Sequence, residues 1–206
     1  MSYLLEHPAR VAALALAHVE LVGAALALAC AIAFPLGVFA ARKPKLRGWL
    51  LGTLGALYTI PSLALLAVLV QLFGLGEAPI FVALIAYAQF MLARSVAAGI
   101  AAVDPAQVAA ARGLGMSDAQ VLARVELPQA LPVILGGIRI AAIASIAIAT
   151  LGGYVGGSGL GVLIFNGLTL HQSSMIVAGS VSASMLAIIA DGCLRLAERR
   201  ARRALG

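Results

Sequence analysis

The chain has 206 residues, of which 63% are hydrophobic and 11% charged, and its mean hydropathy is +1.06. A soluble globule of this length could not cover so much apolar side chain, so the composition excludes a disulfide-rich scaffold, a disordered chain and an ordinary cytosolic enzyme, and predicts an integral membrane protein. The net charge of +6 does not indicate a nucleic-acid partner, because Lys and Arg lie mostly at the ends of apolar runs without interleaved aromatic residues.

Five apolar stretches are long enough to cross the bilayer as helices, since about 20 residues suffice. They lie at 18–41, 49–73, 79–100, 131–151 and 175–194. The predicted fold is therefore all-α, a polytopic membrane helix bundle that forms a single transmembrane domain over residues 1–206, with its core at 17–196. Pro61 divides the second stretch, which leaves a count of six open. Residues 9–17 are expected to form either a short interfacial helix or an extension of the first span, and not a cleaved signal.

The connections between these stretches differ in basic residues. The first connection holds four, the third holds Arg112 and Arg124, and the tail holds five arginines, whereas the second (74–78) and the fourth (152–174) hold none. Because Lys and Arg favour the cytoplasmic side of a membrane, we expect the N-terminus outside and the C-terminus inside. That orientation requires an odd number of spans, which favours five over six.

The sequence TIPS within the second stretch interrupts an otherwise apolar run. Pro61 either produces a simple kink or breaks the helix so that unpaired carbonyl groups line a path through the membrane. In the second interpretation, Thr59 and Ser62 supply the polar lining of the path.

Aromatic residues make up only 5% of the chain. An aromatic cage is the usual binding site for an organic cation, and Tyr58, Tyr87 and Tyr154 are too far apart in sequence to predict one. We therefore do not expect a high-affinity site of this kind in the chain.

Residues 101–130 form the longest polar connection, and their local signals predict a helix, a glycine turn and a second helix at the membrane face. The first helix is expected to start at Asp104 and Pro105 with Gln107 at capping-box spacing, and to stop at Gly113 and Gly115; the second starts at Ser117 with Gln120 and ends at Pro128. Such a pair either covers the end of the bundle or offers small side chains for close approach by a second protein.

Two charges and a glycine-rich segment follow. Arg139 lies about two turns inside the fourth span, and a charge at that depth needs a partner, for which Asp191 near the end of the fifth span is the candidate. Glycines at 152–161 lack the Gly-Lys-Ser/Thr ending of a nucleotide loop. They form either a flexible loop or an outer gate at Gly156, Gly157 and Gly159.

The two cysteines and three histidines show no metal-ligand spacing, and we expect no metal site and no catalytic residues.

Residues 109–128 resemble the coupling loop of ABC-importer permeases, whose pattern is Glu-Ala-Ala, three residues, Gly, nine residues, Ile, one residue, Leu-Pro. The matching residues are Ala109, Ala110, Ala111, Gly115, Val125, Leu127 and Pro128, with Gly113 and Met116 inside the loop. Ala109 replaces the Glu of the pattern and Val125 replaces the Ile. The loss of the acid fits a permease that works beside a second, non-identical one.

The resemblance extends over most of residues 18–195. TIPSLALL at 59–66, AARGLGMS at 110–117, RVELPQALPVILGGIR at 124–139 and GGSGLGVLIFNGL at 156–168 are similar to permeases that import the osmoprotectants glycine betaine, choline and carnitine. The resemblance also implies a methionine-importer-like permease fold.

The resemblance implies a permease subunit in the bacterial cytoplasmic (inner) membrane that works by alternating access. Its implied partners are cytoplasmic ABC ATPase subunits, which bind ATP and Mg, a second permease subunit that is identical or homologous, and an extracytoplasmic solute-binding protein; no cofactor is expected in this chain. The alternatives are an importer of methionine, another amino acid or an ergothioneine-like betaine, an ion-gradient-driven transporter or channel subunit, and a scaffold without transport. Few ionisable groups lie in the spans, which speaks against an ion relay.

Overall fold

The computed structural model describes residues 2–203, which contain helices and turns and no strand. The elements are α1 (Ser2–Glu6), α2 (Pro8–Arg42), α3 (Pro44–Thr59), α4 (Ser62–Phe73), α5 (Glu77–Ala101), α6 (Pro105–Gly113), α7 (Asp118–Val121), the π-helix η1 (Leu122–Glu126), α8 (Leu127–Ala149), the 3-10 helix η2 (Thr150–Tyr154), α9 (Gly161–Thr169) and α10 (Ser173–Arg203). The predicted all-α fold is confirmed.

Four continuous helical stretches are long and apolar enough to cross a membrane: α2, α5, the segment Asp118–Tyr154 that contains α8, and α10. Helices α3 and α4 meet at an angle of 89° and make a fifth span when counted together. Their 16 and 12 residues correspond to about 24 Å and about 18 Å, short of the ~30 Å hydrocarbon core, so neither spans alone. The structure therefore favours five spans over six, and residues 9–17 extend the first span within α2.

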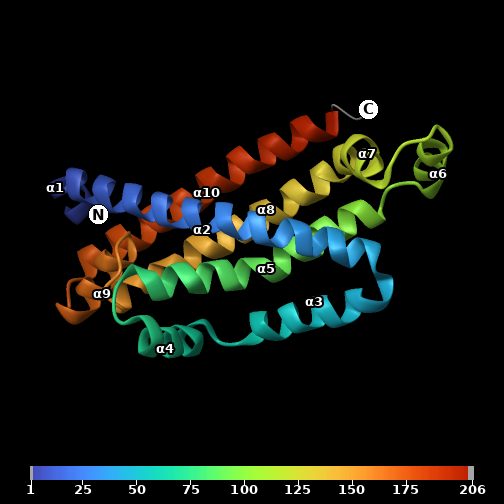
Figure 1. Cartoon of the computed structure of the whole chain (residues 1–206). Helices are drawn as coiled ribbons and strands as arrows, with labels where there is room; N and C mark the ends of the chain where they lie inside the picture. Colours follow the sequence, from blue (N-terminus) through green and yellow to red (C-terminus); the bar gives the residue numbers. More distant parts are fainter. Residues whose placement is uncertain (1, 204–206) are drawn as a thin grey trace.

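Helix α5 lies at the centre of the bundle, between α2 and α8, and α10 packs on the far side of α8 (Figure 1). Small residues allow this close approach: a Cβ atom at Gly37 of α2 would lie 2.5 Å from the Cβ of Val96 in α5, and one at Gly137 of α8 would overlap Ser95. The contact between α2 and α5 is filled by buried alanines from both helices: Ala29 and Ala33 of α2, and Ala88 and Ala93 of α5.

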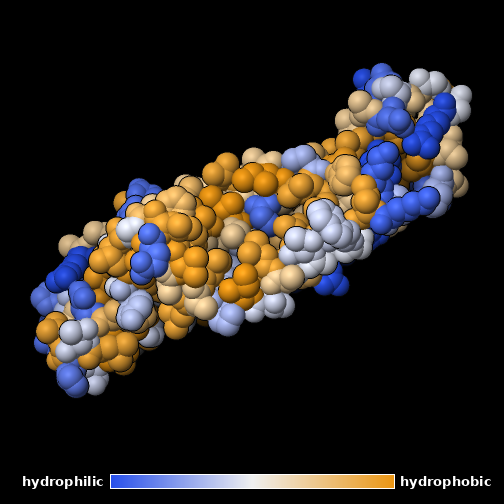
Figure 2. Space-filling model, turned by 60° about the horizontal axis from the view of Figure 1, so that its bottom comes forward, coloured by the Kyte–Doolittle hydropathy of each residue, from blue (hydrophilic) through white to orange (hydrophobic). Residues whose placement is uncertain are grey.

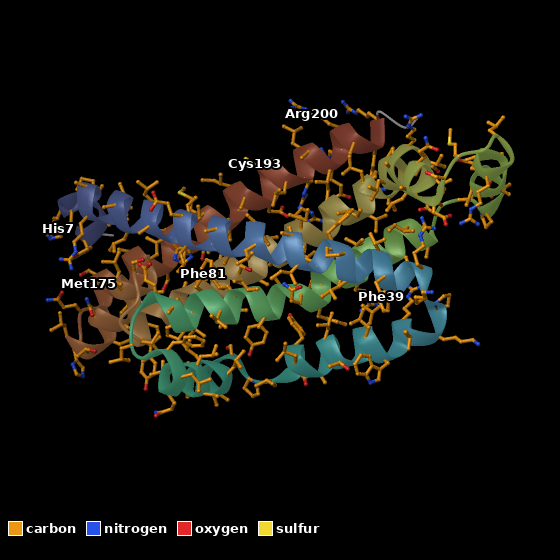
Figure 3. All side chains as sticks on the ribbon, in the orientation of Figure 1. His7, Phe39, Phe81, Met175, Cys193 and Arg200 are labelled. Atoms are coloured by element: carbon orange, nitrogen blue, oxygen red, sulfur yellow. The ribbon has the colours of Figure 1, made fainter. Side chains whose placement is uncertain are left out.

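The two ends of the described chain lie at opposite ends of the bundle, as an odd number of crossings requires (Figure 1). Helices α6 and α7, the α2–α3 corner and the end of α10 share one end, which we call the coupling end. Arg200 lies near it, whereas His7 and Met175 lie at the other end (Figure 3). Hydrophobic residues dominate the surface between the ends, and hydrophilic residues gather at the tip formed by α6 and α7 (Figure 2).

The connection at 152–174 contains two elements that the sequence did not predict, η2 and α9. Helix α9 has nine residues, about 13 Å of helix, so it cannot cross the bilayer and packs against η2 and α10 instead. A Cβ atom at Gly161 would overlap the carbonyl group of Thr150, and one at Gly167 would lie 2.8 Å from Ile176. Glycines thus fold this connection tightly back onto the bundle.

Candidate coupling and translocation sites

Helix α6 begins and ends through local hydrogen bonds that the sequence largely predicted. The carboxylate of Asp104 accepts a hydrogen bond from the backbone N–H of Ala106 at 2.9 Å, and Pro105 is the first helical residue. At the other end, Gly115 has φ +83°, its N–H bonds to the carbonyl of Arg112, and the next N–H, of Met116, bonds to that of Ala111. This is a Schellman motif, so Gly115 ends the helix, while Gly113 is its last residue.

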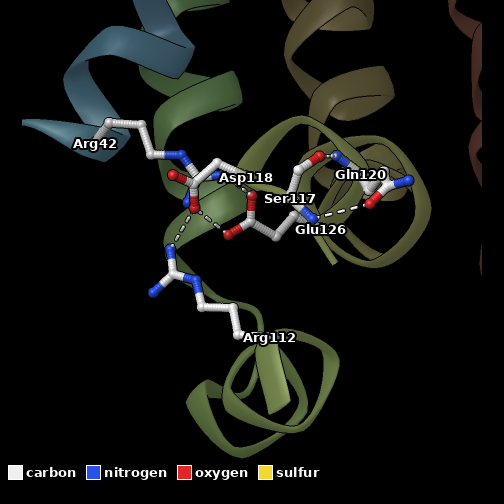
Figure 4. Close-up of polar contacts among 6 residues, drawn as sticks. All are labelled: Arg42, Arg112, Ser117, Asp118, Gln120 and Glu126. Carbon is white, nitrogen blue, oxygen red and sulfur yellow. Dashed lines mark hydrogen bonds and ion pairs between the residues drawn. The ribbon is translucent and has the colours of Figure 1, made fainter. Parts of the chain in front are cut away.

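Helix α7 starts in a complete capping box, as predicted. The N–H of Gln120 donates to the Ser117 hydroxyl at 3.3 Å, and the N–H of Ser117 donates to the Gln120 side chain at 2.8 Å (Figure 4). An exposed ion pair between Arg112 and Asp118, 2.9 Å long, joins α6 to α7 (Figure 4). The turn between the two short helices is therefore held by local side-chain contacts.

Two expectations about this segment are wrong. Gln107 does not complete a capping box: its side-chain carbonyl accepts a hydrogen bond from the Gln129 amide at 2.6 Å and so ties α6 to α8. Pro128 does not end the second helix, because α7, η1 and α8 run on as one helical segment. A proline ring clashes with the carbonyl four residues earlier in an α-helix, here Arg124, and the wider π turn of η1 precedes Pro128 and relieves that clash.

The residues of the coupling pattern lie at the coupling end and differ in exposure. Exposed positions are Ala109, Ala110, Gly113, Gly115 and Pro128; Met116, Val125 and Leu127 are half-buried, and Ala111 is buried. The sequence reasoning missed Leu114, whose side chain is 81% exposed between the two glycines. A single exposed leucine is ordinary on a protein surface; this one lies in the turn between α6 and α7, where a second protein that docked on the two short helices would contact it.

Glu126, inside the coupling pattern, was also missed. Its carboxylate forms two hydrogen bonds with the guanidinium of Arg42, at 2.8 Å (Nη1–Oε1) and 2.5 Å (Nη2–Oε2) (Figure 4). The Glu126 side chain is 4% exposed and that of Arg42 30%. Local spacing could not reveal a partner 84 residues away, and the sequence analysis counted Arg42 only among the four basic residues of the first connection.

At the α3–α4 break the backbone polar groups are largely paired within the chain. The carbonyl of Ile60 accepts a hydrogen bond from the Tyr87 hydroxyl at 2.6 Å, and that of Pro61 accepts the first backbone bond of α4. The Thr59 hydroxyl donates to the carbonyl of Ala56 at 2.7 Å. Thr59 and Pro61 are exposed and Ser62 is half-buried. The break is thus a defined bend in which the carbonyls of Ile60 and Pro61 both accept hydrogen bonds, so the expected unpaired carbonyl groups are not found at these two residues.

Three aromatic rings meet beside this break, contrary to the expectation from sequence separation. Tyr58 lies 6.0 Å from Tyr87, ring centroid to ring centroid, in an edge-to-face arrangement, and 5.7 Å from Phe90. Tyr154 is separate and contacts Phe165 at 5.5 Å. The expectation fails for Tyr58 and Tyr87 because α3 folds back along α5 (Figure 1).

The glycine-rich segment at the far end is a folded turn and not a flexible excursion. Gly156 and Gly159 have φ +80° and +97°, and the N–H of Gly157 bonds to the carbonyl of Gly152 at 2.8 Å. The Ser158 hydroxyl donates to the carboxylate of Glu77, which anchors the turn to the start of α5. Glycine is needed at both positive-φ positions because other L-residues are strained there.

His18 fastens this turn to the bundle, a role that its isolated place in the sequence did not indicate. The buried ring accepts a hydrogen bond at Nδ1 from the N–H of Leu160, 3.3 Å away, and its Nε2 lies 3.1 Å from the carbonyl of Ile146. Because Nδ1 accepts, the proton of the neutral ring is on Nε2 and is donated to Ile146. One side chain thus joins α2, α8 and the turn that precedes α9.

The structure brings Arg139 and Asp191 together. Arg139 Nη1 donates to Asp191 Oδ1 at 2.8 Å, and Arg139 Nε lies 3.4 Å from Glu198 Oε2. Arg195 and Arg202 pair in turn with Asp191 and Glu198, each one helical turn away. The sequence prediction missed Glu198 because it ended the fifth span at 194, whereas α10 continues to Arg203.

The family described as binding-protein-dependent transport system inner membrane component matches residues 33–203. The carnitine transport permease protein OpuCB of Listeria monocytogenes is 37% identical over 183 residues, 89% of this chain and 84% of the relative. The choline transport system permease protein OpuBB of Bacillus subtilis is 40% identical over the same shares, and the osmoprotectant import permease protein OsmW of Salmonella typhimurium is 36% identical over 93% and 92%.

Solved structures show the same fold. An inward-facing structure of the MetNI methionine ABC transporter superposes with a TM-score of 0.82 over 97% of this chain and 99% of that chain, at 20% identity. A crystal structure of an amino acid ABC transporter with histidines gives 0.73 over 96% of each chain, at 21% identity. Identities this low carry the fold and leave the solute open.

Proposed function

The chain belongs to the family of binding-protein-dependent transport system inner membrane components, and we propose that it is the permease through which an ATP-driven importer moves a small osmoprotectant such as glycine betaine, choline or carnitine. The observation that carries the choice of solute is the 36–40% identity to carnitine, choline and osmoprotectant permeases over most of both chains. The likeness to the MetNI methionine transporter, at 20% identity, is one of fold and does not carry the choice of solute.

The proposed mechanism divides the work among subunits. ATP and Mg bind to partner ATPase subunits, which contact Ala109, Ala110, Leu114 and the other exposed residues of the coupling segment (residues 101–130). This permease pairs with a second, identical or homologous permease, and a solute-binding protein delivers the solute from outside. In this arrangement the N-terminus is outside and the coupling end faces the cytoplasm, as the distribution of Lys and Arg predicts.

Alternating access then requires movement at both ends of the bundle. Displacement of the coupling segment by the ATPases shifts α8, which continues from η1 without a break, relative to its neighbours. At the far end the turn at Gly156, Gly157 and Gly159 forms the outer gate, and the bend at Thr59, Pro61 and Ser62 lines the path. The two hydrogen bonds of His18 hold the turn in one defined conformation, which supports a gate that moves between distinct conformations rather than a disordered loop.

Uptake into proteoliposomes tests this proposal. The chain, co-expressed with its ATPase and binding-protein partners, should take up radiolabelled glycine betaine, choline or carnitine when ATP is supplied on the ATPase side. A protonophore should leave uptake unchanged, and an ATPase subunit inactivated at its catalytic glutamate is the matched control that should abolish it. Uptake that needs an ion gradient and no ATP would overturn the mechanism, and ATP-driven uptake of methionine alone would overturn the solute class.

A further inference from the structure

An ion pair between a buried carboxylate and a half-buried guanidinium connects the coupling segment to the end of the first long helix. Glu126 is the last residue of η1, and Arg42 is the last residue of α2. Two hydrogen bonds between their side chains fix the relative position of the two groups in distance and in orientation. Figure 4 shows Arg42 reaching Glu126 from the end of its helix, while Arg112 approaches Asp118 from the other side.

An apolar cluster lies beside the pair. Val96, Ile100 and Ala130 form a buried cluster, against which Val38, Ala41, Leu122 and Ile134 pack. Glu126 lies one helical turn from both Leu122 and Ala130, and Arg42 follows Ala41 directly, so the pair borders this cluster. A carboxylate that is 4% exposed cannot be rehydrated without opening the packing. Separating the charges is therefore costly, and the two residues move together.

The pair also has a distinct position among the polar contacts of the coupling segment. The bond from Gln129 to Gln107 and the pair Arg112–Asp118 both stay within residues 104–129. Among the side-chain hydrogen bonds and ion pairs of residues 2–203, only the one between Arg42 and Glu126 joins the segment to α2. Lys43 alone separates Arg42 from Pro44, the first residue of α3.

A displacement of η1 thus has two routes into the bundle. One runs along the continuous helix into α8. The other runs through Glu126 and Arg42 to the α2–α3 corner and along α3 to the bend before Ser62. Helix α3 has no buried residue and contacts chiefly α5 and α2, so few other contacts hold it in place.

We propose that Arg42 and Glu126 are positioning residues that transmit movement of the coupling segment to α2 and α3, so that ATP hydrolysis moves the bend at Pro61 as well as α8. This inference rests on the proposed function, since it assumes that an ATPase displaces the segment. It assigns to the pair a role in coupling and not only in folding.

The test compares solute transported with ATP hydrolysed in proteoliposomes that contain the whole complex, with radiolabelled glycine betaine, choline and carnitine in parallel. Glu126→Gln keeps the shape of the side chain and removes its charge. Arg42→Lys keeps the positive charge and removes the bidentate hydrogen bonding to the carboxylate. Lys45→Gln is the matched control, because it removes one charge from an exposed residue of the same corner that makes no ion pair in the described chain. Thermal stability and the amount of bound ATPase are measured for each variant.

We expect both test variants to retain bound ATPase and ATP hydrolysis, while transport per ATP falls by at least about fivefold, the lower end of typical coupling between sites. Lys45→Gln should keep the wild-type ratio. A wild-type ratio in either variant that assembles, with only thermal stability lowered, shows a purely structural pair and overturns the inference. If Glu126→Gln does not accumulate, the ratio in Arg42→Lys decides. Absence of ATP-driven uptake in the wild type instead refutes the proposed function.

Discussion

Replacing Gly159 by alanine should destabilise the turn at the far end of the bundle by an amount that the structure allows us to work out. The residue has φ +97°, and an added Cβ atom would lie 2.8 Å from His18 Nδ1. A non-glycine residue in a left-handed conformation costs about 1–2 kcal/mol. The buried His18 ring is held at both nitrogens, so it can move only by giving up the bond from Leu160, worth about 1 kcal/mol. The expected loss is about 2–3 kcal/mol.

Thermal unfolding of the purified complex in detergent measures this loss. For a chain of this size, about 2–3 kcal/mol corresponds to a melting temperature lower by about 4–12 °C. Gly23→Ala is the matched control on the helix that carries His18: nothing lies within 4 Å of its added Cβ, so stability should be unchanged or slightly higher. If Gly159→Ala melts at the wild-type temperature, His18 does not hold the turn as described.

Three further predictions concern the bend and the charge network. Tyr87→Phe removes the hydroxyl that donates to Ile60 and should cost about 1 kcal/mol of unfolding free energy, and an unchanged melting temperature would show that the bend does not depend on it. Single cysteines over residues 57–66, in a cysteine-free background, should include positions that an impermeant thiol reagent modifies during transport; uniform protection would remove the bend from the path. Exchanging Arg139 and Asp191 should restore only part of the uptake that is lost when either residue alone is replaced by alanine. After the exchange, the acid at 139 faces Glu198 and the arginine at 191 faces Arg195. Full recovery of uptake would show that these two residues act as an isolated pair.

The four continuous spans could be predicted because each of them follows from the length of a single apolar run. The bend could be anticipated from Pro61, and the structure adds its angle. Pro128 misled because a proline after a polar helix usually ends it, and no residue pattern announces the π turn that keeps this helix continuous. Helix α9 escaped notice because a nine-residue apolar stretch next to glycines is too short to signal a span.

In the coupling segment, contacts between residues close in sequence could be predicted, and contacts between residues far apart in sequence could not. The caps at Asp104 and Ser117 depend on residues two or three positions away, and these contacts were predicted correctly in outline. The tie between Glu126 and Arg42 spans 84 residues, and the one between His18 and Leu160 spans 142. Their partners are set by how α2 packs on the rest of the bundle, which no local spacing encodes.

The central claim is that the coupling segment is the surface on which a nucleotide-driven partner acts, and a cysteine at Leu114 tests it most directly. This side chain is 81% exposed at the tip of the segment, so Leu114→Cys, with Cys30 and Cys193 replaced by serine, places one reactive thiol there. We predict that an impermeant reagent modifies it only from the cytoplasmic side and that a short cross-linker joins it to an ABC ATPase subunit. Modification from outside intact cells, or a functional complex without such a subunit, would contradict the account.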